Sequence, residues 1–297
     1  MVGSGDGDGK AAEVGGAMGR ASAPGWGIEV VRRPPAGKRY LHALFDFDGT
    51  VSLLREGWQD VMVPYFMEVL APYCKDGGHG EGRSALSARV REFVDLLTGK
   101  QTIFQCMRLD EEVRSLGGPP ADPYGYKAEY LRRLMARIGG RHAAIREGRS
   151  DPGDHLVPGA VDFLRILRGK EARLYLASGT DEADVVAEAR LLGIEGLFGG
   201  RVHGARDSQK ECSKEAVIRD LLKDNAIRGE DLISFGDGYV EVQLVKEVGG
   251  YAVAVATDES GRAGVDEWKR RRLLSAGADA VVPDFSEAEA LAAFLGY

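Results

Sequence analysis

The chain has 297 residues, a formal net charge of -7 and 44% hydrophobic residues. This length favours one large domain or a core with an inserted module, and the hydrophobic content is enough for a substantial core. The acidic balance disfavours a nucleic-acid-binding protein, and no apolar run reaches the length of a membrane span. We therefore expect neither nucleic acid nor membrane among its partners.

The N-terminal residues 1–38 are predicted to form a disordered tail with a candidate short edge strand at 27–31, because Gly, Ala and Ser dominate residues 1–25. Organelle targeting by this tail stays open, although its acidic residues are untypical of such segments. Cys74, Cys106 and Cys212 are widely spaced and form no CxxC pattern, which is typical of reduced thiols and predicts a cytoplasmic location.

The next region predicts a strand at 41–45 and then helices at 57–70, 84–97, 101–116 and 124–138, the last closed by Gly139-Gly140. Pro64 should kink the first helix or shift its start, and residues 75–82 read as a Gly-rich loop. We therefore expect an all-helical insert over residues 53–156.

Short apolar strands alternate with helices in the remainder of the chain. The strands are predicted at 174–177, 232–235, 251–256 and 280–282, and the helices at 160–167, 182–192, 213–222, 240–248 and 286–295. This alternation predicts an α/β fold whose core, residues 39–52 and 157–297, is a doubly wound parallel sheet of Rossmann-like type. Ligands of such sheets bind beyond the carboxyl ends of the strands.

Two carboxylates follow the first strand, in the string Phe45-Asp46-Phe47-Asp48-Gly49-Thr50. Residues i and i+2 of a strand point to the same face, so Asp46 and Asp48 should lie close together. Like charges in close contact need a cation or a shared proton, and magnesium is the natural partner of a hard oxygen site.

Polar residues also follow two later strands. Ser178-Gly179-Thr180 reads as a turn whose hydroxyl and backbone N–H groups can hold phosphate oxygens, and Gly236-Asp237-Gly238 leads to Glu241. A lysine should offset so many negative groups, and Lys210 and Lys214 are both candidates. Ser213 is a good N-cap, which places Lys214 in the first turn of a helix.

Together these segments resemble, in order, the four motifs of the haloacid dehalogenase superfamily, in particular its phosphatase branch with a helical C1 cap between the first two motifs. In phosphoserine-phosphatase-like members the lysine precedes the metal-binding Asp by roughly two dozen residues. Lys214 lies 23 residues before Asp237 and Lys210 lies 27 before it, so we favour Lys214. Glu241 departs from the commoner Asp.

The resemblance implies a role for each of these residues. Asp46 is the expected nucleophile and Asp48 the general acid and base. Magnesium is expected at Asp46, the Asp48 carbonyl oxygen and Asp237, and phosphate at Ser178, Gly179 and Lys214. Thr50 is expected to support Asp48 by a hydrogen bond, and Glu241 to support the metal directly or through a water.

The expected function is that of a magnesium-dependent phosphatase of a small phosphorylated metabolite, with sugar phosphates as candidates. A phosphomutase on the same core and, less favoured, a non-enzymatic metabolite-binding protein are the alternatives. In the insert, Arg55 and Lys100 are candidate substrate-binding residues. The basic run Lys269-Arg270-Arg271-Arg272 is expected to be a solvated helix face.

Overall fold

The computed structural model describes residues 21–22, 27–74, 81–206, 213–224 and 227–297. Within these residues one eight-stranded sheet has the order β1-β2-β8-β7-β6-β3-β4-β5. Neighbours from β8 to β5 are parallel, whereas β1 and β2 add an antiparallel edge. The strands are β1 (Ala21–Ser22), β2 (Glu29–Val30), β3 (His42–Phe45), β4 (Arg173–Asp181), β5 (Val202–Ala205), β6 (Leu232–Gly236), β7 (Tyr251–Val255) and β8 (Ala280–Val282).

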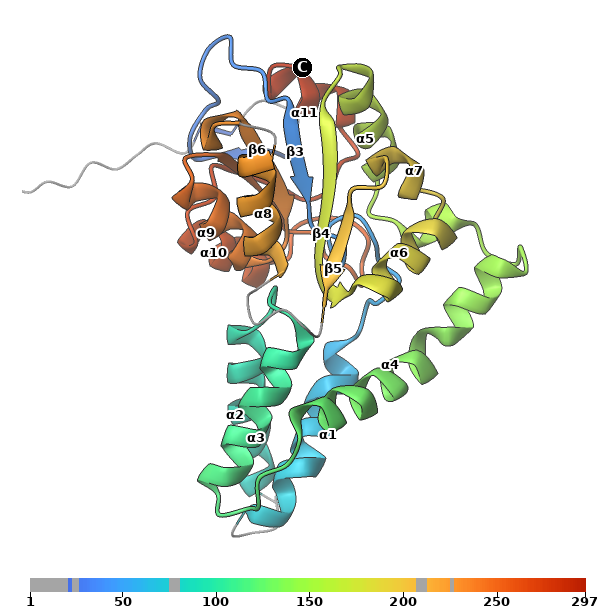
Figure 1. The fold of residues 1–297 in the computed structure, drawn as a ribbon, viewed down its shortest axis with the longest axis vertical. Coiled ribbons are helices and arrows are strands. Elements are labelled where there is room, and N and C mark those ends of the chain that lie inside the picture. The colour runs from blue at the N-terminus through green and yellow to red at the C-terminus, as the bar shows by residue number, and fades with distance from the viewer. Residues whose placement is uncertain (1–20, 23–26, 75–80, 207–212, 225–226) are drawn as a thin grey trace, which may run out of the picture.

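Helices cover both faces of this sheet (Figure 1). Successive side chains of a strand point to opposite faces. Accordingly, Phe45 packs in the apolar core beneath α5, α6 and α11, and Leu44 packs in a second core beneath α8, α9 and α10. These helices are α5 (Ala160–Gly169), α6 (Glu182–Leu191), α7 (Glu195–Phe198), α8 (Ser213–Asp224), α9 (Tyr239–Glu247), α10 (Glu267–Ser275) and α11 (Ala288–Phe294). The predicted doubly wound α/β core is confirmed.

Between β3 and α5 the described residues form four α-helices, which lie within the predicted helical insert of residues 53–156. Its helices are α1 (Gln59–Leu70), α2 (Glu81–Leu96), α3 (Thr102–Ser115) and α4 (Pro123–Arg146), with short 3-10 turns at Ala71–Tyr73 and Pro152–His155. They enclose an apolar cluster of their own, which includes Phe66, Val90, Leu109 and Leu134. In Figure 1 the insert lies beyond the end of the sheet to which the arrow of β3 points.

Three local predictions differ from the structure. Helix α4 continues through Gly139-Gly140 to Arg146, because the buried side chains of Ile138, His142 and Ile145 keep the helical spacing across the glycines. Helix α2 begins at Glu81, inside the predicted loop at 75–82, whose residues 75–80 lie outside the described residues. Ser178-Gly179-Thr180 lies within β4 instead of forming a turn, since β4 continues past a register shift to pair Asp181 with Ala205.

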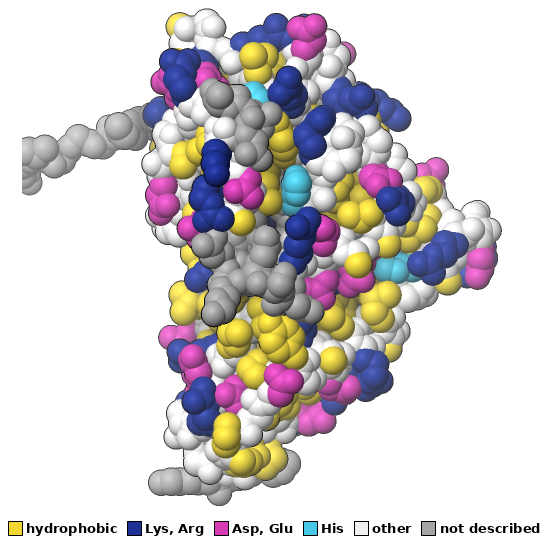
Figure 2. All heavy atoms as spheres, in the orientation of Figure 1, with side chains coloured by type: hydrophobic (Ala, Val, Ile, Leu, Met, Phe, Trp, Pro, Cys, Tyr) yellow, Lys and Arg dark blue, Asp and Glu magenta, His cyan; other side chains and the backbone are white. Residues whose placement is uncertain are grey.

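The N-terminal part of the chain is described only in pieces. Strand β2 falls within the predicted edge strand at 27–31, while residues 1–20 and 23–26 of the predicted tail lie outside the described residues. Among the helices that are described, none is both long and apolar enough to cross a membrane. On the face drawn in Figure 2, Lys and Arg side chains are interspersed with Asp and Glu side chains over the core and the insert.

Candidate active site

Asp46 and Asp237 follow neighbouring parallel strands, so the sheet itself brings them together. The Asp46 N–H donates to the Phe235 carbonyl oxygen at 2.9 Å, which extends the pairing of β3 with β6 by one residue. Directly beneath, the rings of Phe45 and Phe235 stack with their centroids 4.6 Å apart. Both aromatic side chains are fully buried, and this packing fixes the strand ends from which the two carboxylates project.

A cavity of about 90 Å³ lies between these strand ends and the helical insert. Asp46, Asp48, Ser178, Lys214 and Asp237 line it from the core. With Gly179, Arg55 and Lys100, which also line it, the structure brings eight of the ten predicted site residues to one cavity. On the side of the insert, the cavity is lined by Arg55, Glu56, Trp58, Met62, Thr98, Gly99, Lys100, Thr102, Gln105 and Tyr130.

Lys214 is the cation at the base of this cavity. It lies in the first turn of α8, and its Nζ is 2.7 Å from Asp46 Oδ2 and 2.8 Å from Glu241 Oε2. Lys214 is only 1% exposed, so the two carboxylates must replace the water that its ammonium gives up. Their charges raise the pKa of Lys214 against the opposing effect of burial, and the side chain stays charged. The alternative, Lys210, lies outside the described residues.

Glu241 holds Lys214 and the motif around Asp237 together. Its Oε1 accepts a hydrogen bond from the Gly238 N–H at 2.6 Å, while its Oε2 accepts the one from Lys214. Both oxygens of this buried carboxylate are therefore engaged by the protein. Burial raises the pKa of Asp46, with Lys214 opposing the shift and the charge of Glu241 adding to it.

Asp48 accepts hydrogen bonds from two hydroxyl groups of β4. Its Oδ2 accepts hydrogen bonds from Thr180 Oγ1 at 2.8 Å and from Ser178 Oγ at 3.4 Å. Its Oδ1 has no hydrogen-bond partner among the described residues and lies 4.0 Å from Arg55 Nε. Burial raises the pKa of Asp48 to about 6, although Arg55 and the Thr180 hydroxyl act in the opposite direction. Thr180 is not among the predicted site residues, although it belongs to the predicted phosphate-binding segment Ser178-Gly179-Thr180.

Gly179 lies close to the backbone of the insert. A Cβ at this position would lie 2.6 Å from the backbone carbonyl oxygen of Lys100. Only glycine therefore lets the loop between α2 and α3 reach the end of β4. The half-buried Lys100 lines the cavity, and its role in substrate binding stays a prediction.

Arg55 has charged partners in the core, and Thr50 lacks the hydrogen bond that was expected. The Arg55 guanidinium is 6% exposed, and its Nη2 lies 2.8 Å from Glu188 and 3.3 Å from Asp184 on α6. Arg55 lines the cavity but is already paired with core carboxylates. Thr50 is buried, and its Oγ1 has no hydrogen-bond partner among the described residues, so the expected bond to Asp48 is absent.

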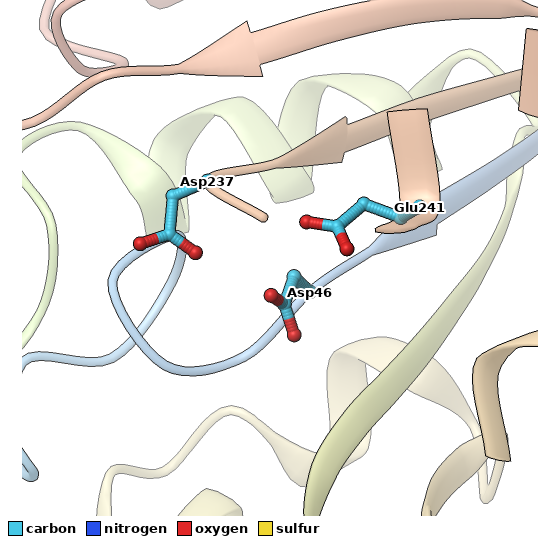
Figure 3. A group of neighbouring side chains, drawn as sticks. All are labelled: Asp46, Asp237 and Glu241. Atoms are coloured by element: carbon cyan, nitrogen blue, oxygen red, sulfur yellow. The ribbon is translucent and has the colours of Figure 1, made fainter. Parts of the chain in front are cut away.

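Oxygen atoms of Asp46, Asp237 and Glu241 lie within 4.8 Å of one another, and Figure 3 shows the three carboxylates converging on one space. Hard oxygen ligands of this kind suit magnesium. Glycine at position 49 leaves room for Asp237, because a Cβ there would lie 2.2 Å from Asp237 Oδ2. Gly49 also has a φ of +74°, which favours glycine. The residues present therefore fit the predicted metal, with Asp46 and Asp237 as candidate ligands beside the Asp48 carbonyl oxygen.

A second, largely buried lysine lies beside Asp237. The prediction that the basic run forms a solvated helix face is wrong for this residue. Lys269 was expected on a solvated face, but its side chain is 11% exposed and its Nζ lies 2.7 Å from Asp237 Oδ2 and 2.5 Å from Glu259 Oε1. The rest of the basic run is more accessible, and Arg271 is exposed. The spacing of a short basic run does not reveal which of its residues faces a buried acid. Lys269 and Glu259 were therefore not among the predicted site residues.

Comparisons with known proteins agree with this arrangement. A family model described as haloacid dehalogenase-like hydrolase matches residues 40–249. A search of curated proteins found no match. Two solved structures share the fold at low identity. A mutant of CbbY from Rhodobacter sphaeroides in complex with xylulose-(1,5)bisphosphate is 19% identical, with a TM-score of 0.52 over 84% of this chain and 96% of that one.

The second structure, described as a predicted phosphatase from Clostridium acetobutylicum, is 17% identical, with a TM-score of 0.53 over 85% of this chain and 98% of that one. At such identities the likeness concerns the fold alone. The family model, by contrast, spans more than two thirds of the chain and includes Asp46, Asp48, Ser178, Lys214 and Asp237. The chain belongs to the haloacid dehalogenase-like hydrolase family.

Proposed function

We propose that this protein is a magnesium-dependent phosphatase that hydrolyses a small phosphorylated metabolite through an aspartyl-phosphate on Asp46. The observation that carries the proposal is that Asp46, Asp48, Lys214 and Asp237 line one small cavity together with Ser178. A nucleophile, a proton carrier and a cation in one cavity are the components that phosphoryl transfer requires.

In the first step, an Asp46 carboxylate oxygen attacks phosphorus, the bond from phosphorus to the ester oxygen breaks, and Asp48 gives its proton to the leaving oxygen. In the second step, Asp48 takes a proton from a water, whose oxygen attacks phosphorus. The bond to Asp46 then breaks and inorganic phosphate leaves. A pKa of about 6 suits Asp48 to both transfers near neutral pH.

The remaining residues bind and orient the phosphoryl group. Lys214, held between Asp46 and Glu241, offsets the charge that collects there, and Ser178 with the Gly179 backbone offers hydrogen bonds from the end of β4. Magnesium, held by Asp46, Asp237 and the Asp48 carbonyl oxygen, would neutralise charge on the phosphoryl oxygens. Glu241 acts by positioning Lys214.

The cavity favours a small substrate. Its volume is only about 90 Å³, and residues of the helical insert cover it. The bisphosphate named for the CbbY structure lends support to sugar phosphates as candidates. Lys100 is the candidate partner for a second polar or anionic group of the substrate, whereas Arg55 is held by Glu188.

The proposal is tested with p-nitrophenyl phosphate, magnesium and two variants. Asp46→Asn removes the nucleophile and should lower kcat by at least about 1,000-fold. Because p-nitrophenolate leaves without protonation, Asp48→Asn should still form the intermediate but hydrolyse it slowly. It should therefore release a burst of one p-nitrophenol per active site, followed by slow turnover.

The matched control is Asp162→Asn, which removes a carboxylate whose side chain is 74% exposed on α5. Wild-type kinetics are expected for it. Unchanged turnover in Asp46→Asn would refute the nucleophile assignment. A panel of phosphorylated metabolites then separates the two enzymatic readings, since a phosphatase releases phosphate stoichiometrically and a phosphomutase interconverts isomers with almost no release.

A further inference from the structure

The active site contains two buried lysines, and they serve different carboxylates. Lys214 contacts Asp46 and Glu241, whereas Lys269 contacts Asp237 and Glu259. Lys269 is held in place by the start of α10, where the Asp266 side chain accepts hydrogen bonds from the N–H groups of Trp268 and Lys269. The cap fixes the backbone of Lys269, and Asp237 and Glu259 hold its ammonium.

Glu259 reaches the site from the segment between β7 and α10. A Cβ on Gly49 would lie 2.9 Å from Glu259 Oε1 and 2.2 Å from Asp237 Oδ2. Both carboxylates therefore lie close to the turn that follows Asp48. Asp237 and Glu259 line both the cavity that contains Asp46 and a neighbouring hollow beside Trp268, and Lys269 lines the second of these. Lys269 thus approaches Asp237 from the neighbouring hollow, since it does not line the cavity that contains Asp46.

These contacts bear on metal binding, and the argument rests on the proposed function because it takes Asp237 as a metal ligand. An ammonium 2.7 Å from Asp237 Oδ2 neutralises the same carboxylate that would attract a divalent cation. Glu259, which shares this ammonium at 2.5 Å, offsets its charge. Removing the lysine or the glutamate should therefore change metal affinity in opposite directions.

We propose that Lys269 is a built-in competitor of the metal at Asp237, and that Glu259 moderates this competition, so that the pair sets how tightly the site holds a divalent cation. When no metal is bound, Lys269 keeps the Asp237 carboxylate in position. When a metal is bound, Lys269 weakens the attraction between Asp237 and the metal. Both residues are positioning residues, since they act through Asp237.

The test measures Mn²⁺ binding directly, by the loss of the free-ion electron paramagnetic resonance signal on titration of the full chain. Lys269→Met removes the charged ammonium and keeps an unbranched side chain that is one atom shorter. It should bind Mn²⁺ about tenfold tighter than wild type, within the range expected for groups that border a metal ligand. Glu259→Gln should bind about tenfold weaker. In the double variant the two changes offset, and affinity returns to within about threefold of wild type.

Arg271→Met is the matched control, because it removes one positive charge from the exposed side of the same helix. It should stay within about twofold of wild type, since exposed charges at a distance are screened. A second readout is the melting temperature. Lys269→Met should melt lower than wild type without metal, because Asp237 and Glu259 then repel each other, and should gain more from added Mg²⁺.

The outcomes separate this inference from the proposed function. Weaker or unchanged Mn²⁺ binding by Lys269→Met, or tighter binding by Glu259→Gln, would overturn the competition and leave the phosphatase assignment intact. If Lys269→Met does not fold, the result for Glu259→Gln alone decides. A wild-type protein that binds no Mn²⁺ at millimolar concentration would overturn both.

Discussion

Gly49 is the residue whose substitution tests most directly how tightly the site is packed. Its φ of +74° costs an alanine about 1–2 kcal/mol of stability. In addition, the new Cβ would lie 2.2 Å from Asp237 Oδ2, where ordinary contacts are 3.4–4 Å. Asp237 must then move by about 1 Å, and a displacement of this size in a catalytic group costs about 100-fold in rate. We therefore expect Gly49→Ala to lose both stability and activity.

Gly37→Ala separates the two effects. Gly37 has a similar φ of +70°, but a Cβ there would meet no atom of the described residues within 4 Å. Urea unfolding should show a loss of about 1–2 kcal/mol in both variants. Hydrolysis of p-nitrophenyl phosphate should show a loss of about 100-fold in kcat/KM for Gly49→Ala alone. If Gly49→Ala kept more than about a third of the wild-type kcat/KM, the close contact with Asp237 would not constrain catalysis.

Two further predictions concern the groups around Lys214 and Asp48. Glu241→Gln leaves Lys214 with Asp46 as its charged partner, so kcat should fall by about 10- to 100-fold in steady-state assays, and a loss below threefold would contradict the positioning role. Thr180→Val removes a hydrogen bond that stabilises the charged form of Asp48, so the pKa of Asp48 rises from about 6. The descending limb of kcat/KM against pH, where Asp48 loses the proton that it gives to the leaving group, should then move about one pH unit higher. An unmoved limb would show that Asp48 is not the group that titrates.

The parts of this molecule that the sequence predicts best are those with a local signature. Alternating apolar strands and helices predicted the α/β core, and the positions of Asp46 and Asp237 at strand ends predicted that their carboxylates meet there. Glycine was misleading in helix α4, because its cost of about 1 kcal/mol per residue is outweighed by packing of the neighbouring buried side chains.

What escaped prediction depends on contacts between distant segments. Lys269 and Glu259 meet Asp237 only because β7 lies next to β6 in the sheet, and no periodicity in the sequence records that neighbour. Arg55 was identified as a candidate for substrate binding, but its partner Glu188 lies on α6, beyond the whole helical insert. Partner choice for charged residues is a tertiary property, and the sequence indicates only that a partner is required.

The pairing of β3 with β6, with Phe45 stacked on Phe235, has a consequence for how the protein acquires activity as it folds. These strands are separated in the chain by the insert and by β4 and β5, so their pairing closes a long loop and is slow compared with helix formation. In a refolding experiment, the helical signal should therefore return first. Hydrolysis should reappear only when the two aromatic rings meet, which makes enzymatic activity a reporter of the last long-range contact to form.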